Sequence, residues 1–177
     1  MIKQEKDIFE LINNLNLSIS NATNYFAYHD FIKPICVTNT YDIPTAQLNI
    51  DRWDLGLKGG TFIINKGDVG FIFCSHDDEA TQLCIKAVSK FLSFMKSKGI
   101  EIVQDNNDFL IDGYKVCGFT HACVEKCILY AMSFNFNVDL DLIKSICTKP
   151  MIKIPKSLAD YGITQEEIIN LITSLNN

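Results

Sequence analysis

The dipeptide Asp112-Gly113 constrains the fold of this chain more than any other feature. It separates two short runs of strand-forming residues, 108–111 and 114–119. An Asp-Gly pair readily adopts the two positive φ angles of a tight hairpin turn, whose twist matches that of the flanking strands. The sequence therefore predicts an antiparallel β-hairpin at this point.

Other elements are predicted on the N-terminal side of this hairpin. The apolar runs 61–64 and 69–74, separated by a four-residue loop that contains glycine, predict a second hairpin. A long amphipathic helix is expected to begin after Ser75, which can act as its N-cap, and to stop at Gly99.

The two ends of the chain carry helical patterns. An apolar stripe predicts a helix over residues 3–15, and residues 139–147 can form another. The segment 164–167 has the sequence of a capping box, which predicts a last helix. Strands interspersed with a few helices indicate an α+β fold, with a mixed or largely antiparallel sheet packed with helices.

Length and composition limit the class of protein. A chain of 177 residues is expected to form a single domain over residues 1–177. The net charge is −5, and Arg52 is the only arginine, so nucleic acid is not an expected partner. The seven cysteines, an odd number, argue against a secreted disulfide framework. No apolar run reaches the ~18 residues of a membrane span, and a cytoplasmic location without membrane contact is expected.

The segment around Gly59 and Gly60 is the first candidate site. Adjacent glycines before a strand let the backbone approach a ligand closely, and their N–H groups can hold an anion. Lys58 adds a positive charge beside them, and Thr61 follows. A simple turn is the alternative interpretation of the same residues.

The return strand of the Asp-Gly hairpin holds the second candidate site. Side chains alternate along a strand, so Lys115 and Cys117 are expected to lie on the same face. Apolar residues surround Lys115, whose ammonium must therefore reach solvent or meet an anion. A solvated lysine on an edge strand is the alternative.

The order and spacing of these segments resemble the catalytic domain of the lipoate–protein ligase, octanoyltransferase and biotin–protein ligase superfamily. That superfamily has a glycine-rich segment, a hairpin and a long helix, followed by an Asn-Asp pair and a Gly-x-Lys-x-x-Gly strand. The matching positions here are Gly59-Gly60-Thr61, Gly67-Asp68, 75–98, Asn107-Asp108 and Gly113–Gly118. Residues 136–140 are similar to the Asn-Val-Asp-Leu strand end of lipoate ligases, which makes the likeness closest to that branch.

The resemblance implies a biotin/lipoate ligase-like domain that attaches a lipoyl or octanoyl group to a lysine of a lipoyl-carrier domain. It implies ATP and Mg²⁺ as requirements, an acyl-adenylate intermediate, and lipoate or octanoate as the fatty acid substrate. Lys115 occupies the position of the catalytic lysine. Residues implied to bind nucleotide or acid are Lys58, Gly59, Gly60, Thr61, Asn107, Asp108 and Gly118.

The sequence also departs from the family pattern. Asp54 and Leu55 stand where the family has paired arginines, and we expect no C-terminal accessory domain. An ATP-independent transferase is therefore an alternative, in which a cysteine attacks the thioester of an acyl-carrier protein; Cys147 and Cys117 are the candidate nucleophiles. A non-catalytic module that binds an acyl group or carrier is another, and a biotin ligase is less favoured.

A metal site is not expected. His121, Cys123 and Cys127 are possible metal ligands, but they lack the paired spacing of a structural zinc site.

Overall fold

The computed structural model describes residues 1–31, 35–38, 51–54, 62–146 and 151–176. The strands are β1 (Lys3–Glu5), β2 (Tyr25–Asp30), β3 (Ile35–Thr38), β4 (Asp51–Asp54), β5 (Phe62–Ile64), β6 (Val69–Ser75), β7 (Val103–Asp105), β8 (Asp108–Ile111), β9 (Tyr114–Val124) and β10 (Cys127–Phe134). The helices are α1 (Ile8–Ser20), α2 (Glu79–Ser97), α3 (Leu140–Ile146) and α4 (Gln165–Thr173), with short 3₁₀ turns at Leu158–Tyr161 and Ser174–Asn176.

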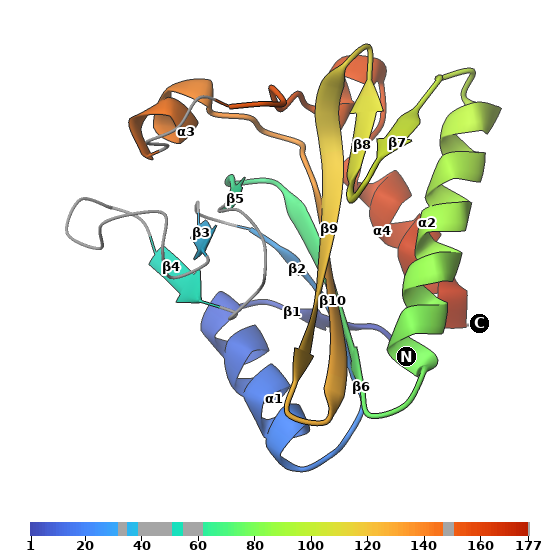
Figure 1. The fold of residues 1–177 in the computed structure, drawn as a ribbon. Helices are drawn as coiled ribbons and strands as arrows, with labels where there is room; N and C mark the ends of the chain where they lie inside the picture. The colour runs from blue at the N-terminus through green and yellow to red at the C-terminus, as the bar shows by residue number, and fades with distance from the viewer. Residues whose placement is uncertain (32–34, 39–50, 55–61, 147–150, 177) are drawn as a thin grey trace.

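Seven of the strands form one mixed sheet, in the order β1-β2-β6-β10-β9-β8-β7 (Figure 1). β1 runs parallel to β2, and the other neighbours in the sheet are antiparallel. Strands β4, β3 and β5 form a second, small sheet. The predicted α+β class, with a mixed sheet packed with helices, is confirmed.

Helices cover both faces of the large sheet (Figure 1). Side chains of β6 alternate between the faces: Phe71 and Phe73 join the core beneath α2 and α4, whereas Ile72 and Cys74 join the core beneath α1. Burial on both faces explains why β6 has an almost continuous apolar sequence. Among the described residues, no helix is long and apolar enough to cross a membrane.

Local signals placed several elements correctly. Asp112 and Gly113 have φ angles of +52° and +81°, as the hairpin turn requires. Gly99, which follows the C-cap residue Lys98 of α2, has a φ of +72°. The capping box at the start of α4 is formed, with Thr164 and Glu167 exchanging hydrogen bonds.

Predicted element boundaries and strand partners differ from the structure at several points. The long helix α2 begins at Glu79 with Asp78 at its N-cap, and not directly after Ser75. The first helix begins at Ile8, because Asp7 caps it and residues 3–5 instead pair with β2. The runs 61–64 and 69–74 were predicted to form a hairpin, but β5 pairs with β3 while β6 pairs with β2 and β10. The turn between β5 and β6 therefore leads from the small sheet into the large one.

Asp68 holds this turn in place. Its buried carboxylate accepts hydrogen bonds from the backbone N–H groups of Phe136 and Asn137, at 2.7 and 3.2 Å, and from that of Asn65 at 2.7 Å. The turn is thereby tied to the segment that follows β10. Burial raises the pKa of Asp68 to about 6, although the backbone donors oppose the rise.

We expect the pH dependence of stability to report on Asp68. A carboxyl group whose pKa is higher in the folded than in the unfolded chain contributes stability at low pH, which is lost as the pH rises through about 6. The loss should amount to about 2 kcal/mol between pH 4 and pH 7. The fall in unfolding free energy from pH 4 to pH 7 is the slope to be measured. Urea denaturation of Asp68→Asn at several pH values should show that this slope has disappeared.

Asp160→Asn, which removes an exposed carboxyl group, is the matched control and should keep the wild-type slope. An unchanged slope in Asp68→Asn would contradict the assignment.

Candidate active site

One extra residue in β9 determines which way the candidate lysine points. Phe109 of β8 pairs with Cys117, but the next residue, Leu110, pairs with Lys115, so Val116 is an additional residue at this point. Such a β-bulge interrupts the alternation of side chains between the two faces of a sheet. The predicted common face of Lys115 and Cys117 is therefore wrong.

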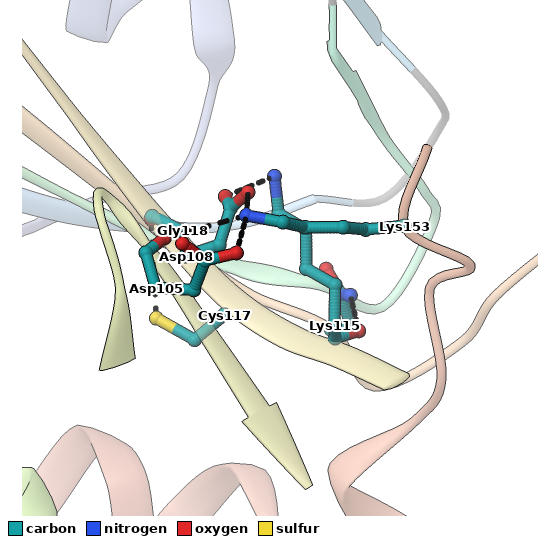
Figure 2. Close-up of polar contacts among 7 residues, drawn as sticks. Asp105, Asp108, Lys115, Cys117, Gly118 and Lys153 are labelled. Atoms are coloured by element: carbon teal, nitrogen blue, oxygen red, sulfur yellow. Dashed lines mark hydrogen bonds and ion pairs between the residues drawn. The ribbon is translucent and has the colours of Figure 1, made fainter. Parts of the chain in front are cut away.

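Two lysines converge on one carboxylate beside this bulge (Figure 2). The Lys115 ammonium lies 2.7 Å from Oδ1 of Asp108, and the Lys153 ammonium lies 2.8 Å from Oδ2 of the same residue. Lys153 also lies 2.8 Å from Oδ2 of Asp105, at the end of β7. The side chains of Lys115 and Asp108 are 28% and 23% exposed, so the pair is open to a ligand.

Lys153 belongs to residues 151–157, which we call the strap. The strap lies along β9 at Lys115: the Lys115 N–H donates to the carbonyl of Ile154, and the Lys156 N–H donates to the carbonyl of Lys115, both at 2.9 Å. The Asn135 amide also donates to the Lys115 carbonyl, at 2.9 Å. The backbone of the candidate lysine is thus held from two sides.

The charges in this cluster stabilise each other. Burial by itself would raise the pKa of Asp108, but hydrogen bonds and charge from Lys115 and Lys153 outweigh it, and the pKa is lowered. Hydrogen bonds to Asp105 and then Asp108 raise the pKa of Lys153. Asp108 is therefore a carboxylate, and Lys153 an ammonium, at neutral pH.

Gly118 leaves the space that the ion pair occupies. A Cβ atom at this position would lie 2.9 Å from Cε and 3.0 Å from Nζ of Lys115, and 3.1 Å from Oδ1 of Asp108. A larger side chain at this position would therefore have to displace the tail of Lys115, whereas the backbone angles of Gly118 do not themselves demand glycine.

Cys117 lies apart from this cluster. Its side chain is fully buried in the core with Phe109 and Val116, and in Figure 2 it points away from the two ammonium groups. Burial raises the pKa of the Cys117 thiol well above its usual value, despite the charge of Lys115. This environment disfavours the thiolate that a nucleophile requires.

The remaining predicted site residues fall into two groups. Asn107 is exposed in the turn before β8, where its carbonyl accepts a hydrogen bond of 2.8 Å from the Phe119 N–H. Lys58, Gly59, Gly60, Thr61 and Cys147 lie outside the described residues. In the part of the chain that the structure describes, no group of three or more His, Cys, Asp or Glu side chains is placed to hold a metal ion.

Sequence reasoning missed Lys153 and Asp105. Both lie in segments without a motif, and only the pairing of the strap with β9 brings Lys153 to the site. The one available signal was the alternation of isoleucine and lysine over residues 152–154, which is typical of an extended segment.

Residues 53–177, more than half of the chain, match the lipoyl protein ligase A/B catalytic domain. The chain belongs to this family. No curated protein is similar enough to the chain to count as a match.

Solved structures of lipoate ligases share the fold of this lipoyl ligase family member. P. falciparum LipL1 in complex with lipoate has a TM-score of 0.71 at 13% identity, and the match covers 98% of this chain and 59% of that one. The bipartite lipoate ligase of Thermoplasma acidophilum, studied with its E2 lipoyl domain, has a TM-score of 0.71 at 12% identity, covering 98% and 79%. Lipoate-protein ligase A bound with ATP has a TM-score of 0.69 at 13% identity, covering 97% and 81%.

We expect Gly118→Ala to destabilise the protein through Lys115. The added methyl group must displace the tail of Lys115 from Asp108. Because the pair is part-exposed and the tail can move, this should cost about 1 kcal/mol of unfolding free energy or less. In a Lys115→Ala background the same substitution should cost far less, because the clashing atoms are absent. Urea denaturation of the four proteins of this double-mutant cycle measures the coupling.

Equal costs in the two backgrounds would show that Gly118 serves the backbone rather than the ion pair.

Proposed function

We propose that the protein is a lipoate/octanoate protein ligase-like acyltransferase, which attaches a lipoyl or octanoyl group to a carrier-domain lysine. The observation that carries the proposal is the ion pair of Lys115: its part-exposed ammonium lies beside Asp108, and its place in the sequence resembles that of the family's motif lysine. Membership of the lipoyl ligase family supports lipoate or octanoate over biotin.

The proposed reaction has two steps. An oxygen of the acid's carboxylate attacks the α-phosphorus of ATP, which forms acyl-AMP and releases pyrophosphate. The carrier lysine then attacks the acyl carbonyl, which forms the amide and releases AMP and a proton. Mg²⁺ would enter with ATP as part of the substrate.

Lys115 would stabilise the negative charge that develops in both steps. A cation about 4 Å from such a charge contributes on the order of 4 kcal/mol at an effective dielectric of 20. The role requires an ammonium that keeps its position when the substrate arrives. The hydrogen bonds from the strap and from Asn135 to the Lys115 backbone supply that rigidity.

The substrates are proposed from what related proteins hold. One solved relative contains lipoate, another contains ATP, and a third is described with its E2 lipoyl domain. These relatives are 12–13% identical to this chain, and what they bind supports the proposed substrates. Within the described residues no disulfide joins the five free cysteines, which supports a cytoplasmic setting.

The test is the intact mass of an apo lipoyl-carrier domain incubated with the protein, ATP, Mg²⁺ and lipoate or octanoate. We expect an ATP-dependent gain of one acyl group on a single lysine. Lys115→Ala should reduce the rate by about 10²–10³-fold, as loss of a donor to a developing oxyanion does. Lys98→Ala, which breaks a surface ion pair with Glu167, is the control and should retain the wild-type rate.

Further reaction mixtures separate the other possibilities. A mass gain from an octanoyl thioester of acyl-carrier protein without ATP would replace the ligase with a transferase. A gain on a biotin-carrier domain would change the acid. A folded protein that modifies no carrier in any mixture would overturn the proposal in favour of a binding module.

A further inference from the structure

The charges around Lys115 are balanced only because Lys153 is present. The cluster contains two carboxylates, Asp105 and Asp108, and two ammonium groups, Lys115 and Lys153. Its formal charge is therefore zero. Without Lys153 it would be −1, and the anionic substrates of the proposed reaction would meet a repulsive field.

The two lysines are bound differently. An ammonium has three donors, and Lys153 directs them at Oδ2 of Asp105, the carbonyl of Asp105 and Oδ2 of Asp108, at 2.8, 3.3 and 2.8 Å. Lys115 contacts Oδ1 of Asp108, its one ion-pair partner among the described residues. Lys153 is thus committed to the protein, whereas Lys115 retains capacity for a ligand.

The geometry leads us to infer that Lys153 is a positioning residue: by neutralising Asp105 and Asp108 it leaves the charge of Lys115 available to the substrate. The inference rests on the proposed function and deepens it. The strap is consequently part of the site, since its pairing with β9 delivers Lys153.

Charge restoration is the experiment that tests this role. Lys153→Met lowers the charge of the cluster to −1, and adding Asp105→Asn returns it to zero without restoring the ammonium. We expect Lys153→Met to raise the KM for lipoate and for ATP by about tenfold or more, with a smaller effect on kcat. The Asp105→Asn/Lys153→Met double variant should recover most of the loss, and Lys153→Arg should behave almost as the wild type.

Two measurements do not depend on turnover. Calorimetric binding of lipoate and of a non-hydrolysable ATP analogue should weaken in Lys153→Met, recover in the double variant, and converge as salt concentration rises. Carboxyl NMR should show a higher pKa for Asp108 in Lys153→Met, because one of the two cations that lower it has been removed. Asp105→Asn alone raises the cluster charge to +1 and should bind both probes more tightly than the wild type.

The outcomes are distinguishable. If the wild type is active and Lys153→Met keeps its KM values and its probe binding, the inference is overturned while the proposed function stands. The same holds if the double variant is not rescued, since Lys153 would then only anchor the strap. If Lys153→Met does not fold, Asp105→Asn carries the test, and unchanged probe binding in that variant overturns the inference. A wild type that binds neither lipoate nor the ATP analogue overturns the proposed function together with the inference.

Discussion

The extra residue in β9 is the constraint on which the rest of the candidate site depends. Without the bulge at Val116, strict alternation would put Lys115 on the face that holds Cys117, in the core beneath α2. A buried lysine without a partner would be very costly there. The bulge instead turns Lys115 toward Asp108 and Gly118, where a small residue leaves room for an ion pair. The bulge therefore lets Cys117 stay in the apolar core while Lys115 contacts a carboxylate.

Asp108 links this bulge to the two lysines of the candidate site. A carboxylate has two oxygens, and here each faces a different lysine, one from β9 and one from the strap. The strap in turn is held by main-chain hydrogen bonds to Lys115 itself. Strands β8 and β9 and the strap thus hold one another in position. An active site needs such mutual support when it must hold a charged group without filling all of its hydrogen bonds.

The sequence predicted the elements whose signals are local. Asp112-Gly113, Gly99 and the Thr164 capping box each specify their own backbone geometry, and all three are formed. The pairing of β5 with β3 was missed because strand partners depend on distant residues. The prediction that Cys117 shares a face with Lys115 was wrong, because a bulge at a valine leaves no local signal in the sequence. Lys153 was missed because its role arises only from a contact with β9.

The strap has a consequence for how the protein acquires its site. Lys115 and Lys153 are far apart along the chain, and α3 and the whole of β10 lie between them. Their meeting requires closure of a long loop, whose entropic cost is recovered only after β9 and β10 have paired. The pair of Asp108 and Lys115 needs only the contacts of one hairpin, whereas Lys153 is expected to join it after the distant strap has docked. We therefore expect the complete charge cluster to form late in folding, after β9 and β10 have paired.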